Sequence, residues 1–130
     1  MHEAFHSNPA TVVVCDDRPE LRDAVRAVLA GNPGFTVVAE AAEGAGCLEI
    51  IRRTRPNILI LDVSMPGGGP EVARAIKAIA PDVHILVYTG RPDLRLWQDM
   101  LDAGADQYLV KTGRLRPLID ALECGLLASS

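Results

Sequence analysis

The sequence predicts a single doubly wound α/β domain, in which helices cover both faces of a five-stranded parallel sheet. Short runs of β-branched and other apolar residues alternate along the chain with segments whose apolar residues recur at helical spacing. Most of the short runs are continuously apolar, as in strands that are buried on both faces. Five strand–helix units within 130 residues leave room for one domain with right-handed crossovers.

The five predicted strands are the apolar runs of the chain. They cover residues 11–15, 35–40, 57–62, 83–89 and 107–110. In the strand order 2-1-3-4-5, the first and third strands are neighbours at the centre of the sheet. The ends of these two strands then meet where open α/β sheets build their binding sites.

Segments with a helical period separate the strands. Their apolar stripes are Leu21, Val25, Val28 and Leu29; Val72, Ile76 and Ile79; Leu94, Trp97 and Leu101; and Leu115, Leu118, Ile119, Leu122 and Leu126. The second helix, residues 45–54, is the least marked because Gly44 and Gly46 lie at its start. Leu96 lies off the stripe of the fourth helix, which makes it a candidate contact residue on the surface.

The residues between these segments agree with the predicted boundaries. Asp17 with Glu20 is typical of an N-cap pair before the first helix. The helix ends are marked by Gly31, Pro56, Pro81 and Gly104. We therefore expect a flexible tail over residues 1–10, one domain over residues 11–127 and a C-terminal end over residues 128–130, with no second domain.

The composition excludes several classes of protein. Apolar residues make up 48% of the chain and the net charge is −4, which excludes a disordered chain because disorder requires low hydrophobicity and high net charge. No basic stripe is present, so we expect no direct binding of nucleic acid. No apolar stretch approaches the roughly 18 residues of a membrane span, and the N-terminus does not resemble a signal peptide.

The cysteines and histidines do not form a metal motif. The cysteines are scattered and without CxxC spacing, at Cys15, Cys47 and Cys124. We expect all three to be reduced and buried as small hydrophobic residues, which indicates a cytoplasmic protein. His2 and His6 lie in the tail and His84 starts a strand, and none has a partner at ligand spacing.

Polar residues follow four of the strands at the point where each strand ends. Asp16 and Asp17 follow the first strand and Asp62 ends the third, while Thr89 and Lys111 end the fourth and fifth. Three carboxylates at one edge of a sheet repel one another unless a cation lies between them. An acid-rich site with only oxygen ligands suits Mg²⁺.

The same edge carries the groups that a phosphoryl transfer needs. Asp62 has the position of a nucleophile, since carboxylates form acyl phosphates in several phosphotransfer systems. Lys111 can neutralise a phosphoryl oxygen and Thr89 can donate a hydrogen bond to another. With charge absorbed in this way, in-line attack on phosphorus depends mostly on positioning and electrostatics.

Four motifs in order resemble one protein family. They are the acid pair after the first strand, LDVSMPGG after the third, YTG after the fourth and YLVK on the fifth. Together they resemble the receiver (CheY-like) domains of two-component response regulators, over residues 11–127. The segment GADQYLVKTG (residues 104–113) is most similar to receivers of the NarL/LuxR type. The resemblance implies a flavodoxin-like (βα)5 three-layer sandwich.

The resemblance also implies a role for each residue of the site. Asp62 is the implied phospho-acceptor, and Lys111 completes the shell around the phosphoryl group. Mg²⁺ is implied to bind Asp17, Asp62 and the backbone carbonyl of Ser64, with Asp16 acting directly or through water. The implied switch pair is Thr89 and Tyr108, in which the tyrosine turns from exposed to buried when the threonine moves inward.

The implied function is that of a signalling switch rather than an enzyme with an external substrate. A sensor histidine kinase or phosphotransfer protein would supply the phosphoryl group, and dephosphorylation would return the domain to its resting state. The surface of the fourth helix, fifth strand and fifth helix would then change and dock a partner or a second copy of the chain. Receivers of this type control transcription through a helix-turn-helix output domain. We expect no such domain in this sequence, which is then either a stand-alone receiver or a piece of a longer protein.

One departure from the family pattern concerns the residue after Lys111. Many receivers carry a proline there, often after a cis peptide bond, whereas Thr112 stands at this position. We expect a trans bond, because a cis bond before a residue other than proline costs about 2.5–4 kcal/mol.

Three other functions would use a similar sheet. A phosphatase with an aspartate nucleophile has its second acid two residues after the first, whereas Asp16 and Asp17 are adjacent. A flavodoxin-like nucleotide binder needs hydrogen-bond donors in the first loop, whereas DDRPE (residues 16–20) presents carboxylates. A receiver-like docking module that is never phosphorylated is the third alternative, since a fold alone does not establish activity.

Overall fold

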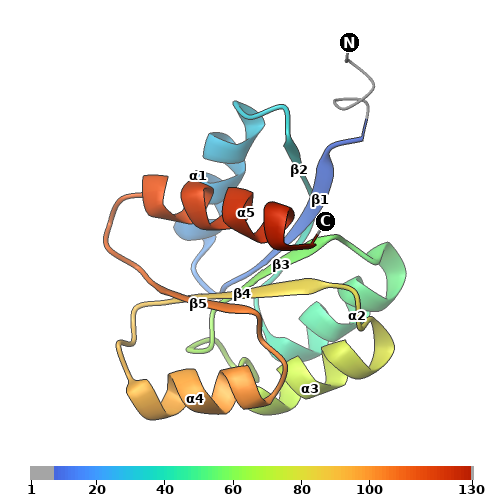
Figure 1. The fold of residues 1–130 in the computed structure, drawn as a ribbon, viewed down its shortest axis with the longest axis vertical. Coiled ribbons are helices and arrows are strands. Elements are labelled where there is room, and N and C mark those ends of the chain that lie inside the picture. Colours follow the sequence, from blue (N-terminus) through green and yellow to red (C-terminus); the bar gives the residue numbers. More distant parts are fainter. Residues whose placement is uncertain (1–7, 130) are drawn as a thin grey trace.

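The computed structural model describes residues 8–129, with side chains through residue 126. It contains a five-stranded parallel sheet between two layers of helices (Figure 1). The strand order β2-β1-β3-β4-β5 confirms the predicted topology. Residues 1–7 of the predicted tail, with His2 and His6, lie outside the described residues, as does residue 130.

The elements alternate along the chain as predicted. The strands are β1 (Ala10–Cys15), β2 (Phe35–Ala41), β3 (Ile58–Leu61), β4 (His84–Thr89) and β5 (Gln107–Val110). The helices are α1 (Pro19–Ala30), α2 (Gly44–Thr54), α3 (Pro70–Ile79), α4 (Leu94–Asp102) and α5 (Arg116–Ser129). Each strand end lies within one residue of its predicted position, and all peptide bonds among the described residues are trans.

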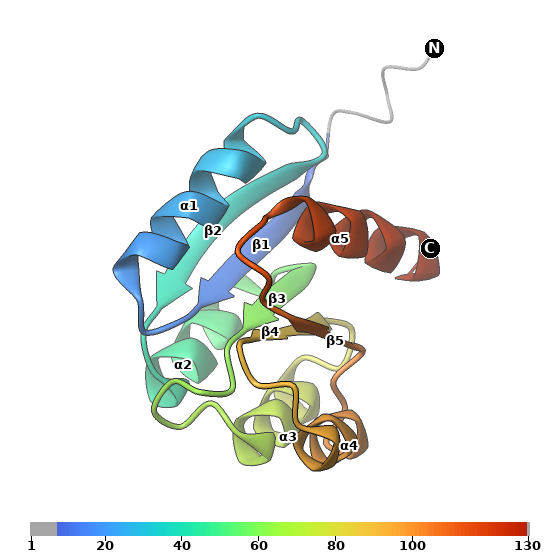
Figure 2. The same ribbon diagram turned by 90° about the vertical axis from the view of Figure 1, so that its left-hand side faces the viewer.

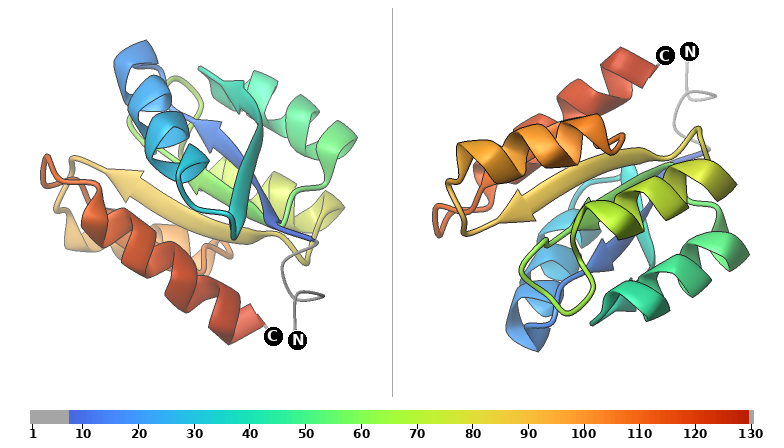
Figure 3. Two further views of the ribbon diagram at one scale, coloured as in Figure 1. Left: turned by 90° about the horizontal axis from the view of Figure 1, so that it is seen from above. Right: turned by 90° about the horizontal axis from the view of Figure 1, so that it is seen from below.

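The two faces of the sheet form two separate halves of the core. Helices α1 and α5 cover one face, while α2, α3 and α4 cover the other (Figures 2 and 3). All four residues of β3 are buried: Ile58 and Ile60 pack toward α1 and α5, and Leu59 and Leu61 pack toward the other three helices. Because side chains alternate between the faces of a strand, a continuously apolar strand serves both halves of the core.

The predicted N-cap of the first helix is wrong. Helix α1 begins at Pro19, and its N-cap is Arg18, whose side chain makes no capping hydrogen bond. The loop is closed instead by Asp16, whose Oδ1 accepts a hydrogen bond from the Arg18 N–H at 2.9 Å. Asp17 is exposed at the end of the sheet and does not cap the helix.

The predicted apolar stripe of the fourth helix is also wrong. Leu94 is 75% exposed and Trp97 is 42% exposed, whereas Met100 is fully buried. Leu96, the candidate surface contact, is partly buried and packs against the core. Residues 96 and 100 share one face because they lie four positions apart, and the Asp93 carboxylate fixes the start of α4 by accepting from the Arg95 and Leu96 N–H groups.

The cysteines are free, but only two of them are buried. A hydrogen bond with Cys47 and burial raise the pKa of the Cys15 thiol, so this thiol stays protonated and unreactive. Cys124 is exposed on α5, because Leu118, Ile119 and Leu122 occupy the buried face of that helix. The prediction that all three cysteines are buried is thus wrong for Cys124.

In the described part of the chain, no helix combines the length and the apolar character that crossing a bilayer requires. This finding agrees with the hydropathy of the sequence, in which each apolar run is only as long as a strand of the sheet.

The orientation of α4 can be tested with two truncations. Met100→Ala is expected to lower the free energy of unfolding by about 2–5 kcal/mol, because it removes a fully buried side chain. Leu94→Ala is expected to change it by less than about 0.5 kcal/mol, because this side chain is exposed. Denaturant unfolding measures both values, and a larger loss for Leu94→Ala would contradict the observed orientation.

Candidate functional site

The predicted site residues meet at the carboxyl edge of the sheet, between β1 and β3. Cys15 pairs with Leu61 across these two strands, so the residues that follow, Asp16 and Asp62, lie side by side. The Asp62 N–H donates to the Cys15 carbonyl at 2.9 Å, which continues the ladder of the two strands to the site. The strand order changes direction here, at the position where open α/β sheets bind ligands.

Three carboxylates share this edge. One oxygen from each of Asp16, Asp17 and Asp62 lies within 4.8 Å of the others. Asp16 is 2% exposed and Asp62 is 3% exposed, while Asp17 is exposed to solvent. Carboxylates at this spacing repel one another, and burial strengthens the repulsion because the local dielectric constant is low.

Lys111 supplies the positive charge closest to the acids. Its Nζ lies 2.8 Å from the Asp16 Oδ2 and 3.6 Å from the Asp62 Oδ2. The Lys111 N–H donates to the Thr89 carbonyl at 2.7 Å, which holds the end of β5 to the end of β4. One ammonium offsets only one of three carboxylates, so the cluster retains negative charge. Its all-oxygen donors and this charge fit a hard divalent cation such as Mg²⁺.

The hydroxyls of Thr89 and Ser64 lie next to each other at this edge of the sheet. Thr89 is fully buried, and its Oγ1 lies 3.4 Å from the Ser64 Oγ. The Ser64 N–H donates to the Asp62 Oδ1 at 3.0 Å, which orients the carboxylate. Asp62 thus lies between a backbone donor and an ammonium, with the buried hydroxyl of Thr89 linked to the same loop.

The loop after β3 folds back tightly onto Asp62. Its turn passes through Gly67, whose φ of +71° is a conformation that favours glycine. A Cβ on Gly68 would lie 2.5 Å from the Asp62 carbonyl oxygen. The loop is also bound to the start of α2, where the Gly44 N–H donates to the Pro66 carbonyl at 2.8 Å. The turn that holds Ser64 next to Asp62 therefore depends on glycines.

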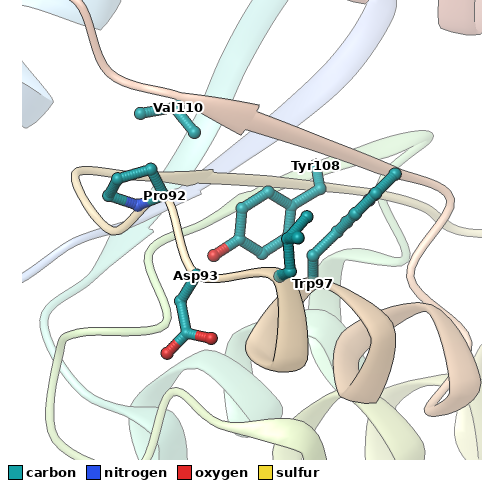
Figure 4. Close-up of a pocket in the computed structure, with 6 residues that line it drawn as sticks. Pro92, Asp93, Trp97, Tyr108 and Val110 are labelled. Atoms are coloured by element: carbon teal, nitrogen blue, oxygen red, sulfur yellow. The ribbon is translucent and has the colours of Figure 1, made fainter.

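Tyr108 lies beside the site rather than in it. Strand β5 pairs with β4, with Val110 opposite Thr89 and Tyr108 opposite Val87. The Tyr108 hydroxyl donates to the Arg91 carbonyl at 2.8 Å, and the half-buried ring lies between the loop after β4 and Trp97 (Figure 4). This position is intermediate between the exposed and buried states that we expected of the residue.

Tyr88 was not among the predicted site residues. Its buried ring lies under Lys111, with the Nζ 5.7 Å from the ring centroid, within the range of a cation–π contact. Burial and the charge of Asp16 raise the pKa of the Tyr88 hydroxyl, which keeps this residue neutral. The available signal was an aromatic residue directly before Thr89, but nothing in the sequence placed it next to the lysine.

Comparison with known proteins assigns the chain to a family. The family model of the response regulator receiver domain matches residues 12–123. The chain is 32% identical over 124 residues to the nitrate/nitrite response regulator protein NarP of Escherichia coli, covering 95% of this chain and 58% of NarP. It is also 32% identical over 124 residues to the transcriptional regulatory protein DegU of Brevibacillus brevis, covering 95% of this chain and 52% of DegU.

Solved structures agree with this result. A two-component response regulator of the LuxR family from Aurantimonas sp. superimposes with a TM-score of 0.87 at 30% identity, covering 93% of this chain and 87% of that chain. The chain spans about half the length of the curated relatives named above. The similarity to those relatives therefore concerns one domain of each.

The dependence of the loop on glycine can be tested at two positions. Gly68→Ala is expected to lower the free energy of unfolding by about 1–3 kcal/mol, because the added methyl group meets the carbonyl oxygens of Asp62 and Met65. Gly90→Ala is the control, since its Cβ would meet nothing within 4 Å. Denaturant unfolding compares the two, and equal stabilities would contradict the close approach of the loop to Asp62.

Proposed function

The chain belongs to the response regulator receiver domain family of two-component systems, within the NarL/LuxR type, and we propose that phosphorylation of Asp62 operates its switch. The observation that carries the proposal is the position of Asp62, which is buried beside Asp16 and lies 3.6 Å from the Lys111 ammonium. A carboxylate with these neighbours is suited to accept a phosphoryl group rather than to serve as a structural ion pair.

The phosphoryl donor is a phosphohistidine of a sensor kinase or phosphotransfer protein. An oxygen of Asp62 attacks phosphorus, the bond from phosphorus to the histidine nitrogen breaks, and the electron pair of that bond leaves with the imidazole. Lys111 offsets the charge that gathers on the phosphoryl oxygens, and Thr89 donates a hydrogen bond to one of them. Hydrolysis of the acyl phosphate then restores Asp62.

The acid cluster is proposed to hold Mg²⁺. Asp17, Asp62 and the backbone carbonyl of Ser64 would bind the ion, and Asp16 would act directly or through water. The close carboxylates and the single ammonium beside them support this proposal. When bound, the ion offsets the repulsion between the acids and the negative charge of the incoming phosphoryl group.

The signal is proposed to leave the site through Thr89 and Tyr108. A phosphoryl group adds about −1.5 to −2 charges and three acceptor oxygens, which draws the Thr89 hydroxyl toward Asp62 and opens space for the Tyr108 ring. An apolar pocket of about 260 Å³ already adjoins this ring, lined by Pro92, Asp93, Leu94, Trp97, Tyr108 and Val110 (Figure 4). Movement of the ring would reshape the surface of α4, β5 and α5.

This α4–β5–α5 surface is proposed to dock a partner or a second copy of the chain. The exposed side chains of Leu94 and Trp97 support the proposal. DegU, one of the relatives named above, is by its name a transcriptional regulatory protein. By analogy, we propose that this cytoplasmic receiver controls transcription through an output domain or partner rather than by binding DNA itself.

Phosphorylation at Asp62 is testable by intact mass. Incubation with Mg²⁺ and acetyl phosphate is expected to add one phosphate to the wild-type chain and none to Asp62→Asn, because the amide is a far weaker nucleophile than a carboxylate. Asp82→Asn is the control, since Asp82 is exposed in the turn before β4, outside the site, and it is expected to react like the wild type.

The outcome also separates the alternative functions. Absence of an adduct in the wild-type chain with every donor would favour a docking module that is never phosphorylated. A phosphate adduct that persists in Asp62→Asn would show that a different residue is the acceptor.

The coupling of Thr89 to Tyr108 is testable with beryllofluoride, a mimic of the phosphoryl group. In the presence of Mg²⁺, the NMR signals of the Tyr108 ring are expected to shift in the wild type and not to respond to beryllofluoride in Thr89→Ala, because this variant lacks the hydroxyl that the phosphoryl group draws toward Asp62. Sedimentation of the same samples is expected to show a dimer only in the shifted state. Identical Tyr108 signals with and without beryllofluoride would contradict the coupling.

A further inference from the structure

Arg22 connects helix α1 to the acid cluster without touching a carboxylate of that cluster. Its Nη1 donates a hydrogen bond to the backbone carbonyl of Asp16 at 2.7 Å. Its side chain is only 20% exposed although it lies on the helix next to the exposed Asp23. A charged donor to a carbonyl in a partly buried position forms one of the stronger hydrogen bonds in proteins.

The other end of the guanidinium is held by the edge strand. The Arg22 Nε lies 3.1 Å from the Glu40 Oε1 on β2, and the Glu40 side chain is 19% exposed. The next residue of β2, Ala41, accepts the Asp16 N–H at 3.0 Å. Both backbone polar groups of Asp16 are thus fixed by adjacent residues of β2, one directly and one through Arg22.

This arrangement determines how the chain leaves β1. The Asp16 carbonyl belongs to the peptide unit that joins Asp16 to Asp17, and a peptide unit is planar. Fixing the carbonyl therefore fixes the direction in which the chain reaches Asp17. Asp17 is exposed, so the position of its carboxylate depends on the backbone that carries it, whereas the Asp16 carboxylate has its own partners in Lys111 and the Arg18 N–H.

We propose that Arg22 is a positioning residue for the cation site, which keeps Asp17 within reach of Asp16 and Asp62. Glu40 is its anchor. The inference rests on the Mg²⁺ binding proposed above. Without Arg22, the Asp16 carbonyl loses this partner, and the repulsion between the acids displaces Asp17 from the cluster.

The test is a calorimetric titration with Mg²⁺ alone, on the full chain. Arg22→Met is expected to weaken Mg²⁺ binding roughly 10-fold, the lower end of the effect of losing a group that orients metal ligands. Arg26→Met is the matched control, because Arg26 lies one turn further along α1 and also pairs with Glu40, but its side chain is 51% exposed. It is expected to bind Mg²⁺ like the wild type, and equal binding by Arg22→Met would overturn the inference.

Two further measurements separate positioning from a general structural or charge effect. At saturating Mg²⁺, Arg22→Met is expected to be phosphorylated by acetyl phosphate at the wild-type rate, and a lower rate there would overturn the proposal. Arg22→Lys is expected to remain impaired, because the arginine uses two separate nitrogens of its planar guanidinium, Nε for Glu40 and Nη1 for the Asp16 carbonyl, whereas lysine has a single nitrogen. Full recovery in Arg22→Lys would mean that charge alone suffices, which also overturns it.

Two controls keep the result interpretable. If Arg22→Met does not fold, Glu40→Gln replaces it: this variant keeps the arginine and weakens its anchor, so Mg²⁺ binding is expected to weaken, and unchanged binding would overturn the inference. If the wild type binds Mg²⁺ and Arg22→Met binds it equally well, only the role of Arg22 is overturned. A wild-type chain that binds no Mg²⁺ would overturn the proposed cation site as well.

Discussion

Repulsion between the carboxylates at the end of β1 and β3 is the constraint on which the rest of the site depends. Asp16 and Asp62 are buried next to each other because the central strands of the sheet end there. Buried acids at this spacing need compensation, and Lys111 and the N–H groups of Arg18 and Ser64 supply part of it. The remaining negative charge is what makes the edge suitable for a cation.

The contacts of Lys111 also join the acid cluster to the ends of β4 and β5. Lys111 contacts the acids through its ammonium and Thr89 through its backbone, so β4 and β5 end at one point. Tyr108 lies on β5, the strand that leads to Lys111, and its ring lines the pocket next to Trp97. In the proposed switch, a change of charge at Asp62 acts on the ends of β4 and β5 and alters the surface around Tyr108.

Strand β2, at the edge of the sheet opposite β5, supports the acid cluster through the residues at its end. Strand β2 carries no residue of the acid cluster, but Glu40 and Ala41 hold Arg22 and the Asp16 backbone. The loop after β3 is held in a similar manner by its contact with Gly44 at the start of α2. Both loops that carry acids are therefore bound to elements that do not themselves reach the site.

The sequence by itself determined the strands, their polar ends and five of the residues that meet there, because a buried parallel strand is continuously apolar and its last residue is placed by the strand. Tertiary structure decided which face of α4 is buried, since two helical stripes compete there and only packing against the sheet selects Leu96 and Met100 over Leu94 and Trp97. It also decided the contacts of Arg22 and Tyr88, because these join residues far apart in the chain and leave no local pattern.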